Sequence, residues 1–156
     1  MNTYEALDNL RNQIEDSVAI SGCKTKVVVT PSAVKEDGLV IKLSLLKTLP
    51  GQPNRAQSRI TGGRTIRVRC AVAGTAESMT GLKDATLAIE ALDSFLPPAT
   101  SRNLHDAEGK PIANTRLAVE IDPEDSFIDN PGSTEIQDVE DIRYITITLP
   151  GGGDSQ

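Results

Sequence analysis

The chain has 156 residues and a formal net charge of -6. This length suits one domain of about 100–200 residues, and a hydrophobic content of 38% with 24% charged residues excludes a chain that is disordered throughout. The acidic balance disfavours a conventional DNA- or RNA-binding protein, because such proteins rely on basic surface to attract phosphate.

The first expected element is an amphipathic helix over residues 3–19. Its apolar side chains recur every three or four positions and form one face. They are Tyr4, Leu7, Leu10, Ile14 and Val18. Asn2 or Thr3 can cap the start of this helix, and Ser21 with Gly22 provides a stop signal.

Strand patterns follow the helix. Residues 24–30 form a β-branched run closed by Pro31, and residues 34–38 look like a polar turn. Residues 38–47 and 64–73 each alternate between two faces, which predicts a hairpin. The connection between them is far longer than the usual loop of roughly two to five residues, so we expect an arm that extends beyond the sheet.

A second helix is expected over residues 80–96, where apolar side chains are again spaced by three and four positions and Pro97 and Pro98 end the pattern. After this helix we expect a polar loop over residues 99–116. Two strands follow, over 116–121 and 141–149, with an acidic segment over 122–140 between them. Residues 150–156 are expected to form a flexible tail.

The expected order of elements is α-β-β-β-α-β-β. It predicts an α+β fold with an antiparallel or mixed sheet of about five strands, two helices packed on it and a long β-hairpin arm. Residues 1–149 would form a single domain. The chain contains no stretch of about 20 apolar residues and has a polar N-terminus, so we expect a soluble protein that stays in the compartment where it is made.

A search for chemistry-bearing motifs gives no support for an enzyme. His105 is the one histidine and lies in a polar segment, where a solvated loop residue is the expected role. No nucleophile, phosphate-loop or zinc motif is present, and the acidic run departs from a calcium loop because Phe127 stands where glycine is needed. We expect no cofactor and no metal. Cys23 and Cys70 fall in or beside apolar patterns and are expected to be buried and unpaired.

Charge is distributed unevenly along the chain. Residues 1–116 carry a net charge of +3, whereas residues 117–156 carry -9. The basic candidates are Arg55, Arg59, Arg64, Arg67 and Arg69, in a stretch without acids. The acidic candidates are Asp122, Glu124, Asp125, Asp129, Glu135, Asp138, Glu140 and Asp141, in a stretch without bases.

Three interpretations of these charges are open. Each segment can be a solvated face, or the two can be complementary parts of a subunit interface, with the acidic side alternatively facing the lumen of a ring. The third interpretation, contact between the arginines and nucleic-acid phosphate, is weaker because aromatic side chains for base stacking are missing nearby.

Over residues 1–149 the chain has an N-terminal helix, a hairpin with a long loop, a single second helix and two C-terminal strands. In this order of elements it resembles the tail terminator proteins of long-tailed bacteriophages. This resemblance rests on element order, size and charge. It implies a structural virion protein of the tail or neck, assembled in the bacterial host cytoplasm as a homohexameric ring. The ring would cap the tail tube, stop its polymerisation and provide the head–tail joining surface.

The partners implied by this resemblance are further copies of the chain, the tail tube protein, the sheath protein of a contractile tail and a neck or head-completion protein. DNA would pass without sequence-specific binding, and no membrane is involved. The alternatives are a head-completion or neck connector protein, the cap of a contractile injection system, or a small ligand-binding or enzymatic domain that holds an anion on its arginines.

Overall fold

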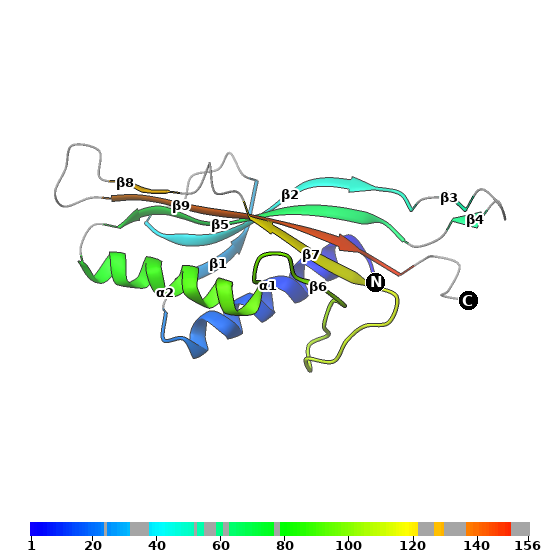
Figure 1. Cartoon of the computed structure of the whole chain (residues 1–156), viewed down its shortest axis with the longest axis horizontal. Coiled ribbons are helices and arrows are strands. Elements are labelled where there is room, and N and C mark those ends of the chain that lie inside the picture. The colour runs from blue at the N-terminus through cyan, green and yellow to red at the C-terminus, as the bar shows by residue number, and fades with distance from the viewer. Residues whose placement is uncertain are drawn as a thin grey trace.

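The computed structural model describes residues 1–23, 25–31, 38–51, 53–54, 59–60, 63–76, 79–121, 127–129 and 137–150. Two helices lie on one face of a long twisted sheet (Figure 1). Among the described residues, no helix is long and apolar enough to cross a membrane. The expected turn over residues 34–38 lies outside this part of the chain except for Gly38.

The helices are α1 (Thr3–Ile20) and α2 (Met79–Phe95). Asn2 caps α1, because its side-chain oxygen accepts a hydrogen bond of 2.8 Å from the backbone N–H of Glu5. The helix ends at Ser21, and Gly22 follows with a positive φ of 80° that glycine adopts without strain. Both helices lie within one residue of their expected bounds.

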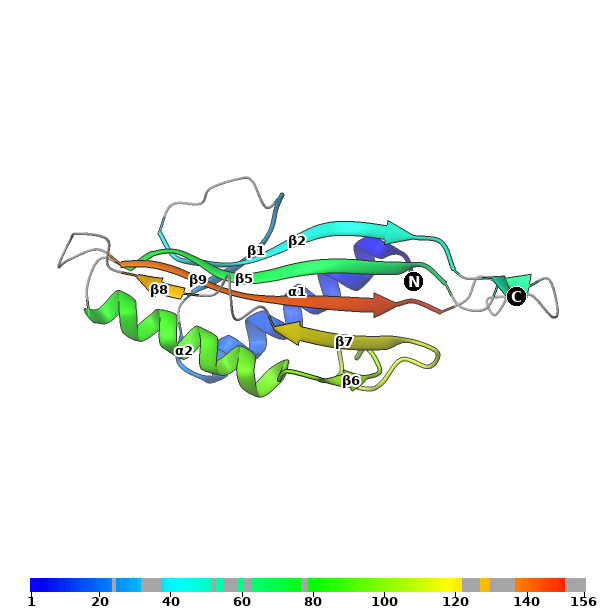
Figure 2. The same cartoon turned by 45° about the horizontal axis from the view of Figure 1, so that its top comes forward.

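The described residues form a main sheet of seven strands. They are β1 (Lys26–Val29), β2 (Val40–Leu49), β5 (Thr65–Ala76), β6 (Ser101–Arg102), β7 (Arg116–Ile121), β8 (Phe127–Asp129) and β9 (Gln137–Thr148). The spatial order is β1-β2-β5-β9-β7-β6, with β8 beside the first part of β9. Figure 2 shows the long strands side by side. Among the described strands, only the pairing of β1 with β2 is parallel, so the sheet is mixed and the expected α+β class is confirmed.

The arm is also present. Strands β3 (Pro53–Asn54) and β4 (Arg59–Ile60) form a separate two-stranded sheet between β2 and β5. In Figures 1 and 2 this small sheet projects beyond the end of the large one.

The core lies between the sheet and the helices. The alternating residues Ile66, Val68, Cys70 and Val72 of β5 are all completely buried, as are Ile145 and Ile147 of β9. Helix α1 contributes Leu10 and Ile14, and α2 contributes Leu92. The period-two and helical patterns of the sequence therefore identify these core faces. The prediction is wrong for Tyr4, which lies in the first turn of α1 and is 76% exposed.

Two segments differ from the sequence expectation. Strand β9 begins at Gln137, four positions before the expected residue 141, because it pairs with β5 through the register from Thr65↔Thr148 to Ala76↔Gln137. Backbone pairing with a long neighbour outweighs the polar composition of this stretch. The expected loop 99–116 contains β6 and the fully buried Leu104, and it is held to α1 by a hydrogen bond of 2.6 Å from Gln13 to the His105 carbonyl.

Candidate functional site

The face of the sheet that lies away from the helices carries the arginines of β5. Because the apolar residues of this strand turn toward the helices, Arg67 and Arg69 project from the opposite face. In the sheet register, Arg67 lies opposite Thr146 and Arg69 lies opposite Tyr144 on β9. The expected pair of arginines on one strand face is therefore present.

Arg69 is paired within its own chain. Its Nη2 atom donates a hydrogen bond of 2.6 Å to Oε1 of Glu140, and the two side chains are 16% and 36% exposed. A short charge-assisted bond between partly buried groups is stronger than a solvent-exposed ion pair. One basic and one acidic candidate are thus partners inside a single protomer, which none of the three interpretations of the sequence anticipated.

Arg67 is held less tightly. Its Nη2 atom lies 3.3 Å from Oε2 of Glu120, a side chain that is 70% exposed. Its Nη1 atom donates to the Thr146 hydroxyl at 3.4 Å, and its guanidinium carbon lies 4.9 Å from the centre of the Tyr144 ring. An ion pair this exposed contributes at most about 1 kcal/mol. The guanidinium is therefore positioned on the sheet surface while part of it still faces solvent.

The other charged candidates are placed only in part. Arg64 is exposed, and its Nε atom donates to the Thr48 hydroxyl at 2.8 Å. Arg59, Asp129 and Asp138 belong to β4, β8 and β9, and at these three positions only the backbone is described. The candidates outside the described residues are Arg55, Asp122, Glu124, Asp125 and Glu135. Their role at an interface remains a prediction.

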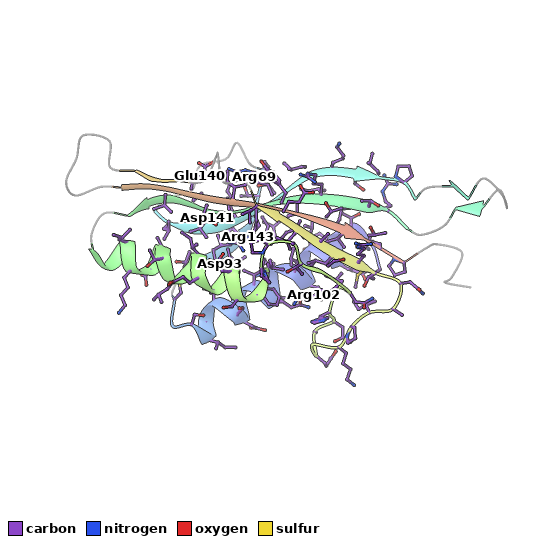
Figure 3. All side chains as sticks on the ribbon, in the orientation of Figure 1. Arg69, Asp93, Arg102, Glu140, Asp141 and Arg143 are labelled. Carbon is purple, nitrogen blue, oxygen red and sulfur yellow. The ribbon has the colours of Figure 1, made fainter. Side chains whose placement is uncertain are left out.

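Asp141 belongs to a second charged group, on the helix side of the sheet (Figure 3). Its carboxylate accepts a hydrogen bond of 3.3 Å from Arg143, which is only 1% exposed. The same guanidinium donates to Asp93 at 2.8 Å and to the Leu96 carbonyl at 2.8 Å. Carbonyls at a helix C-terminus lack intrahelical partners and form the negative end of the helix dipole, so Arg143 ties β9 to the end of α2.

The sequence contains a signal for this group that the motif search did not use. Arg143 falls in the same alternating series as Ile145 and Ile147, whose side chains are buried. A charged residue within an apolar series indicates a buried charge that needs partners. The partners themselves could not be read from the pattern, because Asp93 lies on α2, 50 positions away.

Cys70 lies opposite Arg143 in the sheet register. Complete burial raises the pKa of the Cys70 thiol to about 12, although the neighbouring Arg143 charge opposes that shift. Both Cys70 and Cys23 are buried and unpaired, as expected. A thiol with so high a pKa stays protonated near neutral pH and is a poor nucleophile.

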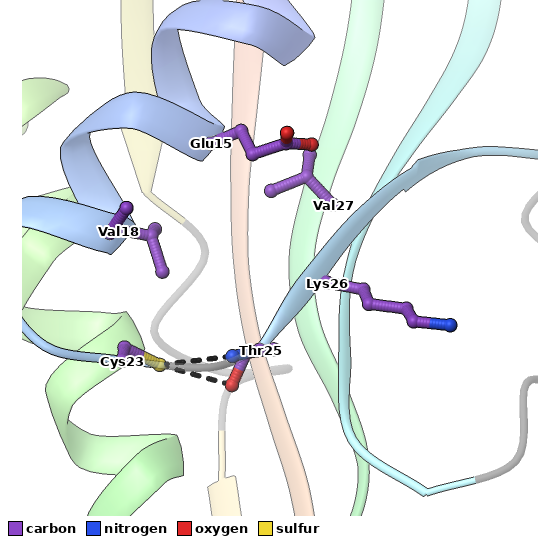
Figure 4. A pocket seen from close by; sticks show the side chains of 7 residues that line it. Glu15, Val18, Cys23, Thr25, Lys26 and Val27 are labelled. Atoms are coloured by element: carbon purple, nitrogen blue, oxygen red, sulfur yellow. Dashed lines mark hydrogen bonds between the residues drawn. The ribbon is translucent and has the colours of Figure 1, made fainter.

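Two cavities follow the junction between α1 and the edge strand β1. The first has a volume of about 390 Å³ and lies beside Cys23, whose thiol donates to the Thr25 hydroxyl at 3.1 Å (Figure 4). The second, of about 380 Å³, is lined by residues 27–29 of β1 and by side chains near the start of α1. Val27 lines both cavities.

The described residues offer no metal site, because they contain no group of three His, Cys, Asp or Glu side chains that could hold an ion. His105 lies in a β-bridge with Pro111 and is partly buried, so it is less solvated than the sequence suggested. The site that the structure defines is thus a charged sheet face with an adjoining sheet edge.

Comparison of the sequence with protein-family models and with curated proteins gives no match. The functional inference below therefore depends on the arrangement of elements and on the charged and apolar surfaces of the chain.

Proposed function

We propose that this protein is a tail terminator of a long-tailed bacteriophage. In this proposal the chain is a structural subunit without catalytic activity that assembles into a hexameric ring at the head-proximal end of the tail tube. The ring stops tube polymerisation and provides the surface that joins tail to head. The protein is then a component of the virion, assembled in the host cytoplasm.

The observation that carries the proposal is the arrangement of elements around the sheet. An N-terminal helix and a single second helix cover one face, a hairpin extends into the β3–β4 arm, and β7 and β9 complete the sheet. This order is the feature on which the resemblance to tail terminators rests. It also leaves the second half of β2 with β5 as its one described strand partner.

The charges support an assembly role over a ligand-binding role. Glu140 and Glu120 already balance Arg69 and Arg67 within the chain, so these arginines are not free cations that converge on an anion. A net charge of -9 over residues 117–156 suits a ring through which DNA passes, because a subunit with so acidic a segment does not adhere to phosphate.

The proposal is tested by adding the purified protein to tail tubes polymerised from the tube protein of the same phage. We expect electron microscopy to show a ring at one end of each tube, and we expect the tubes to stop elongating. Tubes that elongate normally and carry no additional density at either end would contradict the proposal. Density at the neck of whole particles but not at isolated tube ends would instead indicate a head-completion or connector protein.

A further inference from the structure

The second half of β2 is an open edge of the sheet. Strand β1 pairs with β2 only from Val40 to Leu43, and the N–H of Thr30 donates to the Leu43 carbonyl at 3.0 Å before Pro31 ends the strand. Beyond this point β5 is the one described strand that pairs with β2. The strand position beside residues 44–49, in line with β1, is therefore unfilled by any described residue.

This open edge is apolar. Leu45, Leu46 and Leu49 are 42%, 43% and 44% exposed. A register shift between Leu45 and Lys47 places a bulge here, and a bulge and a lysine are common protections of an edge strand. Three exposed leucines on one short edge nevertheless exceed what scattered surface residues explain, and such patches mark sites of interaction.

The apolar surface continues onto α1. Val29, at the end of β1, is 46% exposed, and Tyr4, in the first turn of α1, is 76% exposed. Both residues line the cavity of about 380 Å³ between α1 and β1. The charged residues Asp8 and Arg11 also line this cavity. An edge strand that adjoins a cavity beside a helix is the geometry in which an extended segment adds to a sheet, because the edge offers backbone hydrogen bonds and the cavity receives side chains.

Charge identifies the strand that fits this edge. Lys47 is the one charged residue among residues 44–49, and the exposed Arg64 is bonded to the neighbouring Thr48. An acidic strand is therefore favoured. On the other side of the same sheet, β9 is the one described strand that pairs with β8. The sequence around β8, residues 120–141, holds nine acids and no base. Three of these acids, Glu120, Glu140 and Asp141, are paired with arginines of the same chain. Figure 1 places β8 at the opposite end of the sheet from the free half of β2.

We propose that β8 of one copy adds as a strand to residues 44–49 of β2 in the next copy. The inference rests on the proposed function, because it names the contact through which the ring assembles. Donor and acceptor lie on different edges of the subunit, so the contact is head-to-tail and generates a ring when the rotation closes. The contact covers the three exposed leucines and brings acidic residues close to Lys47.

The test is a pair of cysteines introduced into the full chain, Lys47→Cys with Ile128→Cys. Under mild oxidation we expect a ladder of disulfide-linked oligomers on a non-reducing gel. The unmodified chain, whose native cysteines are buried, gives the background. The matched control combines Lys47→Cys with Glu90→Cys, an exposed position on α2, and should give no ladder above that background.

The outcomes separate the two proposals. A ring that forms without cross-linking overturns the β2–β8 contact and leaves the proposed function standing. Cross-linking within open filaments supports the contact and counts against a terminator ring. A chain that stays monomeric with and without tail tubes, and does not cross-link, overturns both.

A second pair of variants keeps the test valid if the cysteine variants fold poorly. Leu46→Glu with Leu49→Glu removes the apolar contact and places negative charge opposite an acidic strand, and it is expected to weaken self-association by about tenfold or more. Ile20→Glu, at a side chain 87% exposed at the end of α1, should change self-association by less than about twofold. Circular dichroism confirms the fold of both variants. Equal self-association of the edge variant and the unmodified chain would overturn the inference.

Discussion

Arg69 and Glu140 lie 71 positions apart in the chain and are joined by a hydrogen bond of 2.6 Å on the outer face of the sheet. The basic stretch and the acidic stretch therefore meet first within one protomer, through the pairing of β5 with β9. This contact fixes which charges remain for a neighbour. Arg69 and Glu140 are bound to each other. The exposed Lys47 and Arg64, on the β2 side of the sheet, form no ion pair with an acid among the described residues.

Reversing Arg69 is expected to destabilise the fold. Arg69→Glu brings two carboxylates together in a partly buried site, and we expect the free energy of unfolding to fall by about 1–2 kcal/mol. The charge swap Arg69→Glu with Glu140→Arg should recover most of that loss, as measured by urea denaturation. Arg67→Glu is the matched control, because its partner Glu120 is 70% exposed, and should cost less than about 1 kcal/mol. An equal loss for both reversals would show that the Arg69–Glu140 bond does not stabilise the sheet.

The buried Arg143 group is expected to be strongly coupled. Asp93→Ala or Asp141→Ala alone leaves one carboxylate beside the guanidinium and should cost about 1 kcal/mol. Removal of both carboxylates leaves the Arg143 guanidinium, which is 1% exposed, with only the Leu96 carbonyl as a described partner. The double variant should therefore lower the free energy of unfolding by about 3–5 kcal/mol. A double-mutant cycle measured by denaturation gives the coupling. Strictly additive losses would contradict the account of this group.

Cys70 predicts a loss of stability at alkaline pH. The thiol keeps its proton up to a pKa of about 12 in the folded state, whereas an unfolded cysteine loses it near pH 8.5, approximately the ordinary value. The unfolded state therefore binds fewer protons between these values, and the free energy of unfolding falls as pH rises through that range. The slope reaches about 1.4 kcal/mol per pH unit.

Replacement of the thiol checks the assignment of this slope. Cys70→Ala should remove the thiol's share of the decline above about pH 8.5. Val68→Ala is the control, because it deletes buried volume from the same strand face without a titratable group. If the pH slopes of the two variants coincide, the thiol is not the source of the alkaline instability.

Gly74 is expected to tolerate no side chain. Its φ is +135°, and a Cβ atom there would lie 1.9 Å from the Gly38 carbonyl oxygen, in the backbone that leads into β2. Gly74→Ala should therefore cost about 2–4 kcal/mol in thermal or urea unfolding. Gly109→Ala, at a φ of +80° with no atom within 4 Å, should cost only about 1–2 kcal/mol because it meets backbone strain alone. Similar losses at the two positions would contradict the close approach at Gly74.

The sequence predicts most of the fold because the decisive patterns are local. The helical spacing of Leu7, Leu10 and Ile14 and the alternation of Ile66 and Val68 each mark a buried face without reference to other parts of the chain. The fold class, the five main strands and the arm follow from such patterns. Strand ends are less predictable, since the start of β9 at Gln137 depends on a partner 61 positions earlier in the chain, Ala76.

The candidate site is predicted less completely because its contacts are long-range. Alternation correctly places Arg67 and Arg69 on one strand face. No sequence signal shows that Glu140 lies within 2.6 Å of Arg69, or that Asp141, its neighbour, turns to the other side of the sheet toward Arg143. The open edge beside residues 44–49 is likewise invisible in the sequence, because it results from the length of β1 relative to β2.

The molar mass of the assembled protein tests the central claim, that this chain is a ring subunit, most directly. Size-exclusion chromatography with light scattering gives that mass over a range of protein concentrations. The same measurement is repeated on protein released from tail-tube ends. The account predicts a single closed species of six subunits, each of 16.6 kDa. A mass of one subunit at every concentration, together with no recovery from tube ends, would contradict it.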